Sequence, residues 1–345
     1  MLDDSPALPG PVLAGAATEP ALLEVRSLGV QIRTRRESID IVRDVSFEVA
    51  RGETVAVLGE SGSGKTMTGH AIMGILDTPP AYISSGSISF QGHDLLKMPE
   101  RRRRDIRGRH ISMIFQDSLS ALNPVFSVGF QVAEVLRKRA GMGRREANAR
   151  AAELLDLVEI PNARNRMRDY PHEFSGGMRQ RVMIAMAIAL EPELLIADEP
   201  TTALDVTIQA QIMETLQRLC SDRDMGLILI THDLGVVSEF ADRIILMYAG
   251  RVVESCVTAG IFTQAAHPYS RALLDSVPQS AHRETGLNVI PGAPPDPREV
   301  GVGCAFAPRC SHAMDQCLVA VPPTVTVAPG HRSACLIARE LADHV

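Results

Sequence analysis

The segment that most constrains this chain is a glycine-rich stretch at residues 59–66, which reads Gly-Glu-Ser-Gly-Ser-Gly-Lys-Thr. Glycines at this spacing let successive backbone N–H groups turn inward and surround phosphate oxygens. An apolar run at residues 53–58 precedes the stretch and a helical pattern at residues 65–76 follows it. This is the strand–loop–helix context of a phosphate-binding loop. The residues of the predicted loop are Gly59, Glu60, Ser61, Gly62, Ser63, Gly64, Lys65 and Thr66.

Two side chains of this loop predict how a nucleotide binds. The ammonium group of Lys65 supplies a point charge to the β- and γ-phosphates, and the hydroxyl of Thr66 is expected to ligate Mg²⁺. The helix that begins near Lys65 also directs its positive dipole end toward the same phosphates. We therefore expect the chain to bind ATP with Mg²⁺ and to hydrolyse it.

A second apolar run, at residues 194–197, ends in the acidic pair Asp198 and Glu199. A buried strand that ends in this way can deliver Asp198 to the water shell of Mg²⁺. Glu199 is then placed to polarise the attacking water as a general base. Taken alone, the run fits a core strand that ends in solvated acids equally well, but the phosphate-binding loop upstream favours the catalytic interpretation.

A third motif, at residues 174–178, reads Phe-Ser-Gly-Gly-Met and precedes a long helical pattern. A serine and two glycines at a helix start form another anion cradle. One nucleotide does not need two cradles for its γ-phosphate. We therefore expect this cradle to serve ATP that is bound by a second subunit.

The arrangement of apolar runs predicts an α/β domain from about residue 22 to residue 265. Residues 22–32 and 39–49 are expected to form an antiparallel lead-in. Residues 127–172 show helical periodicity without a strand pattern, which predicts a helical subdomain inserted into the core. Further strands are expected at residues 82–90, 110–115, 193–197, 226–230 and 243–247, with a helix at residues 207–220.

The two ends of the chain differ from this core. Residues 1–21 are rich in Pro, Gly and Ala and are expected to be a disordered lead-in. Proline is frequent in residues 278–330, and four of the six cysteines fall between residues 304 and 335. We therefore expect residues 266–345 to form a separate small module.

Composition and charge exclude some classes of function. Of the 345 residues, 45% are hydrophobic and 22% are charged, which is the balance of an ordinary globular protein. A net charge of -6 and the absence of Trp argue against a nucleic-acid partner. The run Arg101–Arg104 is expected to lie on a solvated helix face. Neither an apolar stretch of about 18 residues nor a positively charged start is found, so we expect no membrane span and no export.

Together the motifs resemble the nucleotide-binding domain of ABC transporters over residues 22–265. The shared motifs, in chain order, are the loop at 59–66, a Q-loop at Gln116, the signature at 174–178, the Asp198–Glu199 pair, a D-loop at 203–205 and a switch histidine at His232. The resemblance implies that Thr66, Gln116 and Asp198 hold Mg²⁺, that Glu199 activates water and that His232 contacts the γ-phosphate. The residues that the resemblance assigns to the partner's ATP are Ser175, Gly176, Gly177 and Met178, with Asp205 in the D-loop.

One position departs from the family pattern. The family usually stacks adenine on an aromatic residue shortly before the phosphate-binding loop, whereas residues 38–41 here read Ser-Ile-Asp-Ile. Weaker adenine binding or a rearranged contact near Ile39 is therefore expected.

A narrower resemblance connects the chain with the oligopeptide/dipeptide and nickel importers. It rests on residues 120–124 (Ser-Ala-Leu-Asn-Pro), 170–181 and 267–269 (His-Pro-Tyr), and on the cysteine-bearing tail. In that subfamily the ATPase pairs with a second, related ATPase and with two membrane permeases, which an extracytoplasmic binding protein supplies. The resemblance implies a peripheral protein on the cytoplasmic face of the membrane that energises peptide import. Nickel and opine-like compounds are alternative cargoes.

The tail cysteines predict a metal group. Clustered cysteines in an intracellular protein more often bind metal than form disulfides. Their spacing lacks the close pairs that are typical of zinc sites. The subfamily resemblance implies a 4Fe-4S cluster, with Zn²⁺ or four unliganded thiols as alternatives. The four residues are Cys304, Cys310, Cys317 and Cys335, whereas His331 is expected on the surface or in an outer shell of the site.

Two other classes of function are weighed against an importer subunit. Soluble ABC proteins of translation usually carry two ATPase domains, and those of DNA repair insert long modules before the signature; neither pattern is found here. A binding module that has lost catalysis is disfavoured because Lys65, Asp198, Glu199 and His232 are all present.

Overall fold

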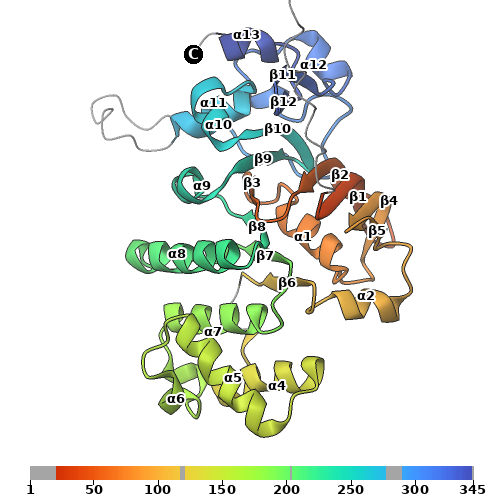
Figure 1. Cartoon of the computed structure of the whole chain (residues 1–345). Coiled ribbons are helices and arrows are strands. Elements are labelled where there is room, and N and C mark those ends of the chain that lie inside the picture. The colour runs from red at the N-terminus through yellow and green to blue at the C-terminus, as the bar shows by residue number, and fades with distance from the viewer. Residues whose placement is uncertain (1–20, 117–120, 203, 277–289, 344–345) are drawn as a thin grey trace, which may run out of the picture.

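A computed structural model describes residues 21–116, 121–202, 204–276 and 290–343 (Figure 1). The expected lead-in at residues 1–20 and parts of the motifs, including residues 117, 120 and 203, lie outside these ranges. None of the helices within the ranges combines the length and the apolar character that a bilayer crossing requires.

The centre of the molecule is an eight-stranded sheet with the order β11-β12-β10-β9-β3-β8-β7-β6. Five neighbouring strands, from β9 to β6, are parallel. Helices cover both faces of a parallel sheet, so its strands read as continuous apolar runs. The bounds of these strands are Thr54–Leu58 (β3), Ile111–Ile114 (β6), Leu194–Asp198 (β7), Gly226–Ile230 (β8) and Arg243–Tyr248 (β9).

A second sheet of four antiparallel strands, in the order β2-β1-β4-β5, confirms the predicted antiparallel lead-in. Its inward side chains, such as Val25, Val45 and Ile88, are buried and share one apolar cluster with the strands of the central sheet. The bounds are Leu23–Arg33 (β1), Ser38–Val49 (β2), Ala81–Phe90 (β4) and His93–Asp94 (β5).

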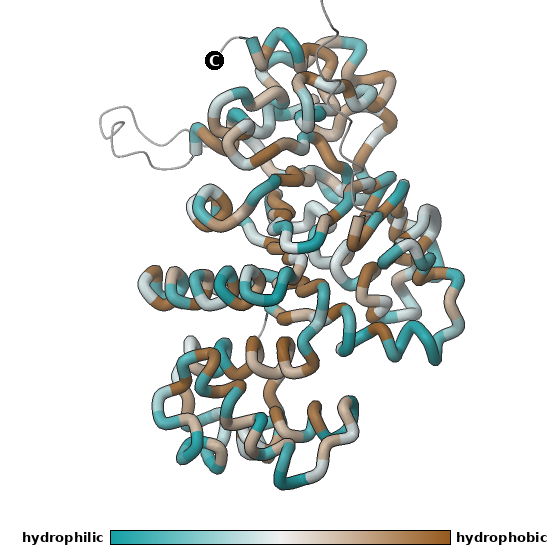
Figure 2. Tube along the Cα trace, viewed as in Figure 1, coloured by the Kyte–Doolittle hydropathy of each residue, from teal (hydrophilic) through white to brown (hydrophobic). Residues whose placement is uncertain are grey.

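Four helices lie near the parallel strands: α1 (Lys65–Met73), α2 (Glu100–Ile106), α8 (Val206–Asp222) and α9 (Leu234–Phe240). The arginine run lies on α2, which buries no residue and is hydrophilic up to its last residue, Ile106 (Figure 2). Glu100 pairs with Arg103 and Arg107. The run is therefore a solvated face, as the sequence predicts.

The predicted helical insertion lies between β6 and β7, at the opposite end of the molecule from the C-terminal segments (Figure 1). Ala151, Leu154, Leu155 and Val158, spaced at helical intervals, are all buried in its core. The bounds are Val128–Val135 (α4), Leu136–Ala140 (η1), Arg144–Leu157 (α5), Ala163–Arg166 (α6), Pro171–Glu173 (η2) and Gly176–Ile188 (α7).

The C-terminal part does not fold apart from the core, which corrects the expectation of a separate module. Strand β12 pairs with β10, and β11 pairs with β12, so the tail extends the central sheet. These strands are too short for a sequence pattern to reveal them. The bounds are Arg251–Val257 (β10), Thr258–Gln264 (α10), Pro268–Asp275 (α11), Ala307–Arg309 (η3), Asp315–Val319 (α12), Val325–Ala328 (β11), His331–Ser333 (β12) and Ala338–Asp343 (α13).

The buried carboxylate of Glu254 on β10 joins β12 and the start of α11 to the central sheet. It accepts hydrogen bonds from the backbone N–H groups of Ala266 (2.7 Å) and His267 (2.9 Å), from the hydroxyl of Ser270, and it contacts Nε2 of His331 at 2.7 Å. His331 is 3% exposed, so its predicted place on the surface is wrong. Four partners offset the cost of burying the charge.

His267 makes the stability of this region depend on pH. Its Nδ1 accepts the N–H of Tyr269 at 3.0 Å, which requires an unprotonated nitrogen. Burial lowers the pKa of His267 to about 4, whereas a histidine in an unfolded chain titrates near about pH 6.5. Between these values the unfolded state binds more protons. Stability is therefore complete above about pH 6.5 and is lost as the pH falls toward 4.

We expect the free energy of unfolding to be about 2 kcal/mol lower at pH 5 than at pH 7.5 because of His267. Urea denaturation at both pH values measures the difference. In His267→Asn, which retains an acceptor for the cap, the pH difference should shrink by this amount. His93→Asn, at an exposed position, is the matched control. Equal pH differences in wild type and His267→Asn would show that His267 is not responsible.

Candidate nucleotide-binding site

The phosphate-binding loop connects β3 to α1 and depends on its glycines. Gly59, Gly62 and Gly64 have φ angles of 150°, 80° and 97°, which glycine adopts at little cost. A Cβ atom on Gly59 would lie 2.2 Å from the carbonyl oxygen of Met247. The loop can therefore hold this shape only with glycine at residue 59.

The loop contains a buried cation and a buried hydroxyl without a partner in the described part of the chain, which are features of an anion site. Lys65 is 6% exposed, and its ammonium group donates to the carbonyl oxygens of Gly59 (2.7 Å) and Glu60 (3.0 Å). Burial lowers the pKa of Lys65, and the nearby carboxylates of Glu199 and Asp198 oppose this shift. The hydroxyl of Ser63 is buried without a hydrogen-bond partner among the described residues. The residues present thus fit a bound phosphate chain.

The carboxyl end of β7 brings the predicted metal ligands together. Asp198 is 2% exposed, and its Oδ1 accepts the hydroxyl of Thr66 at 3.2 Å. Burial raises the pKa of Asp198, and the hydrogen bond from Thr66 opposes this shift. Thr66, Gln116 and Asp198 line one cavity of about 480 Å³, together with apolar side chains of the helical insertion. An oxygen-rich corner of this kind suits Mg²⁺.

Glu199 connects two of the other predicted site residues, Gln116 and His232. Its carboxylate accepts Nε2 of Gln116 at 2.8 Å and the hydroxyl of Thr202 at 2.8 Å, and it lies 3.3 Å from Nδ1 of His232. The backbone of Glu199 has φ = 45°, an unusual value for a residue other than glycine. Such strain is typical of functional positions, where the surrounding fold determines the conformation.

The signature residues lie on the surface at the start of α7. Ser175 caps this helix by accepting the N–H of Met178 at 3.4 Å, and both Ser175 and Gly176 are exposed. A Cβ atom on Gly177 would lie 2.5 Å from Cγ2 of Ile208, so a small residue is required there. Among the described residues, no hydrogen bond joins the segment 174–178 to the segment 59–66. In the D-loop, Asp205 is the N-cap residue of α8.

Sequence reasoning missed one group of contacts to this site. Arg309 and Tyr269 form hydrogen bonds with Glu60 of the phosphate-binding loop, and Arg309 also donates to the hydroxyl of Tyr248. Arg309 and Glu60 are 249 residues apart in the sequence. No local pattern links them, so only the folded chain reveals this contact.

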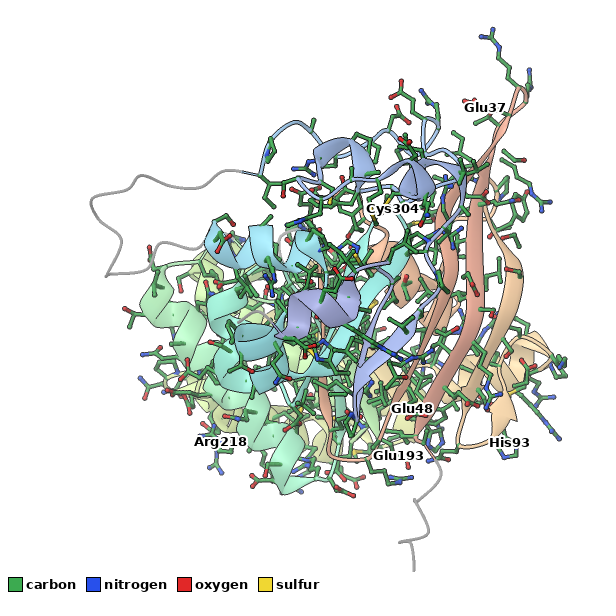
Figure 3. The ribbon with its side chains drawn as sticks, turned by 90° about the horizontal axis from the view of Figure 1, so that it is seen from above. Glu37, Glu48, His93, Glu193, Arg218 and Cys304 are labelled. Atoms are coloured by element: carbon green, nitrogen blue, oxygen red, sulfur yellow. The ribbon has the colours of Figure 1, made fainter. Side chains whose placement is uncertain are left out.

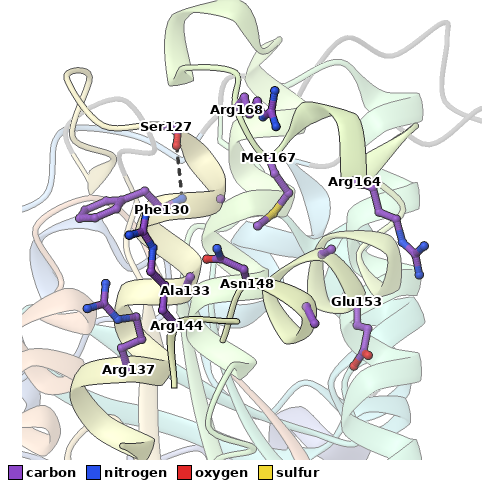
Figure 4. A pocket seen from close by; sticks show the side chains of 13 residues that line it. Ser127, Phe130, Ala133, Arg137, Arg144, Asn148, Glu153, Arg164, Met167 and Arg168 are labelled. Carbon is purple, nitrogen blue, oxygen red and sulfur yellow. Dashed lines mark hydrogen bonds between the residues drawn. The ribbon is translucent and has the colours of Figure 1, made fainter. Parts of the chain in front are cut away.

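A larger cavity lies elsewhere, within the helical insertion (Figure 4). Its volume is about 920 Å³, and α4, α5 and the segment around α6 line it. None of the predicted site residues contributes to it. Size therefore does not identify the site in this protein, whereas the convergence of chemically matched groups does.

Comparison with known proteins agrees with this geometry. The family model described as "ABC transporter" matches residues 42–202, and the model described as "Oligopeptide/dipeptide transporter, C-terminal region" matches residues 253–317. The chain is 48% identical to the oligopeptide transport ATP-binding protein OppD of Salmonella typhimurium, over 93% of this chain and 96% of that protein. It is 47% identical to the corresponding AppD of Bacillus subtilis, over 92% of this chain and 97% of that protein.

Among solved structures, a dimeric ATP-binding cassette in a post-hydrolysis state with ADP and phosphate resembles the chain with a TM-score of 0.61 and 28% identity. The similarity covers 68% of this chain and 98% of that cassette. The chain belongs to the ATP-binding proteins of the ABC transporter family. The predicted cassette fold is thereby confirmed, and with it an ATPase that acts with ATP and Mg²⁺.

The predicted 4Fe-4S cluster is wrong. The relatives are named as ATP-binding proteins, and in the described residues the four cysteines form no group of three donor atoms close enough together to hold a metal ion. The thiols instead line one small cavity beside Phe306, and Figure 3 places Cys304 among the C-terminal loops. Burial raises the pKa of Cys304 and Cys310, and raises that of Cys335 to about 11. The cavity-lining cysteines are Cys304, Cys310, Cys317 and Cys335.

The zinc alternative is also disfavoured by geometry. Tetrahedral zinc would hold sulfur atoms within about 4 Å of one another. In the described residues, the only group of three or more donor atoms within 4.8 Å of one another is Glu254, Cys256 and His331. In that group the carboxylate of Glu254 already has four hydrogen-bond partners, one of which is His331 itself. Neither set is suited to a metal ion in this structure.

Proposed function

We propose that this chain is the ATP-hydrolysing subunit that energises peptide import across the cytoplasmic membrane. The observation that carries the proposal is the convergence of Thr66, Gln116, Asp198, Glu199 and His232 next to the phosphate-binding loop. The names of the relatives, which concern oligopeptide transport, support the cargo. So does the match of residues 253–317 to the C-terminal region of oligopeptide/dipeptide transporters.

The contacts suggest a role for each side chain. Lys65 would leave its loop carbonyls and bind the β- and γ-phosphates. Thr66 and Asp198, with Gln116, would hold Mg²⁺. Glu199 would accept a proton from the attacking water. His232, 3.3 Å from Glu199, would contact the γ-phosphate and position that carboxylate.

The exposed signature residues support a site that two ATPase subunits share. Ser175 and Gly176 face solvent rather than their own phosphate-binding loop. We propose that they close on ATP bound by a second, related ATPase, with Gly177, Met178 and the D-loop residue Asp205 nearby. The remaining proposed partners are two membrane permeases and an extracytoplasmic binding protein. The chain would then act as a peripheral protein on the cytoplasmic face.

Uptake measurements in the source organism test the cargo. Deletion of this chain's gene should abolish uptake of radiolabelled di- and oligopeptides, and wild type but not Lys65→Ala should restore it. Nickel uptake and uptake of an opine-like compound serve as parallel measurements. Loss of either of these with unchanged peptide uptake would contradict the proposed peptide cargo.

A further inference from the structure

The C-terminal segment reaches back to the phosphate-binding loop and contacts Glu60. The guanidinium group of Arg309 forms two hydrogen bonds with this carboxylate, Nη1 to Oε2 at 2.6 Å and Nη2 to Oε1 at 3.1 Å. The backbone N–H of Glu60 donates to the hydroxyl oxygen of Tyr269 at 2.9 Å. Because the carbonyl oxygen of Glu60 also accepts from Lys65, all three polar parts of this residue are held.

The arginine in this contact is built into the fold. Its side chain is 6% exposed, and Nε donates to the carbonyl oxygen of Pro291 at 2.8 Å. Nη1 also donates to the hydroxyl of Tyr248 at 3.1 Å, and the guanidinium carbon lies 5.8 Å from the centre of that ring. A bidentate and largely buried arginine–carboxylate pair is stronger and more specific than a surface ion pair.

An aromatic cluster joins the C-terminal segment to the strands that carry the loop. The ring centres of Tyr248 and Tyr269 are 4.7 Å apart, and Phe306 lies 5.3 Å and 5.4 Å from them. Tyr248 is the last residue of β9, which pairs with β3 immediately before the loop. These packed aromatic rings thus support Arg309 next to the phosphate-binding loop.

The position of Glu60 explains why a counter-charge is needed. Its carboxylate belongs to a loop that must receive the negative charges of a nucleotide triphosphate. An unpaired carboxylate there repels the ligand and opposes the charge of Lys65. Pairing with Arg309 cancels this charge and keeps the side chain in one orientation.

We propose that Arg309 is a positioning residue for nucleotide binding: it neutralises and orients Glu60, so that the C-terminal segment sets the affinity of the phosphate-binding loop for MgATP. The inference rests on the proposed nucleotide site and adds a role for the tail. The pairing also lets the carboxylate of Glu60 lie beside an anion site without repelling the nucleotide.

A double-mutant cycle on the full chain tests the proposal, with MgATP affinity measured by isothermal titration calorimetry. Arg309→Gln leaves Glu60 unpaired and should weaken MgATP binding about tenfold or more. Glu60→Gln should weaken binding less than Arg309→Gln does, because it removes the repelling charge. The double variant should return to within about threefold of wild type, since no charge is left uncompensated. Arg298→Gln is the matched control, because its paired side chain is 60% exposed in the same segment.

Thermal unfolding of each variant separates a local effect from loss of the fold. Arg309→Lys keeps the positive charge and should retain most of the affinity. If Arg309→Gln and the double variant are equally weak, Arg309 acts through packing and the charge proposal is overturned. Unchanged affinity in Arg309→Gln would also overturn it. Absence of MgATP binding by wild type would instead contradict the proposed nucleotide site, whatever the variants show.

Discussion

Lys65→Ala is expected to abolish detectable MgATP binding, with an affinity loss of at least about a hundredfold. Lys65 is the buried cation of the loop, and its ammonium group, now bonded to two loop carbonyls, is the group that we expect to bind phosphate oxygens. Alanine removes this charge and leaves the carboxylates of Asp198 and Glu199 uncompensated near the phosphates. Titration calorimetry with MgATP on the full chain measures the loss.

The control for this variant is Lys97→Ala. Lys97 is 84% exposed and pairs with Asp94, away from the loop. Its replacement should leave the affinity unchanged. If Lys65→Ala folded like wild type and bound MgATP with full affinity, residues 59–66 would not be the nucleotide site.

Glu199→Gln should lower ATP hydrolysis about a hundredfold to ten-thousandfold while MgATP binding persists. The amide keeps the shape of the side chain and a hydrogen bond from Thr202, but it cannot accept a proton from water. Without hydrolysis, ATP should remain between two ATPase subunits. Phosphate release measures turnover, and size-exclusion chromatography with MgATP reports the closed dimer of the chain with its partner.

Glu214→Gln, at an exposed position on α8, is the matched control for charge loss. It should hydrolyse ATP at the rate of wild type. Unchanged hydrolysis in Glu199→Gln would remove Glu199 from the role of general base. Loss of binding together with turnover would indicate that Glu199 supports the fold of the site rather than the chemistry.

The fold was readable from the sequence wherever local patterns reflect burial. The parallel strands are apolar runs because both faces of the sheet are covered. The glycine loop is recognisable because its spacing lets successive backbone N–H groups surround phosphate. The expected helix at residues 65–76 ends earlier, at Met73, because Gly74 adopts φ = 63° and its N–H bonds back to the last turn. Partly buried Ile75 and Leu76 continue the apolar pattern beyond the helix and caused the error.

Contacts between segments that are distant in the chain could not be predicted from the sequence. The pairing of β12 with β10 and the Arg309–Glu60 pair depend on residues that lie far apart in the chain. His331 shows the same limit, because only tertiary packing places it against Glu254. The cysteines show a different limit of sequence-based prediction. Their spacing indicates that they lie close together, but their burial, which raises the pKa of Cys335 to about 11, depends on the fold.

The most direct test of the account measures phosphate release by the assembled transporter in lipid vesicles, with and without peptide-loaded binding protein. The assembly that we propose contains this chain, a partner ATPase and two permeases. The account predicts hydrolysis that the peptide-loaded binding protein accelerates and that Lys65→Ala in this chain strongly reduces. A rate that is the same without permeases and peptide, or that Lys65→Ala leaves unchanged, would contradict it.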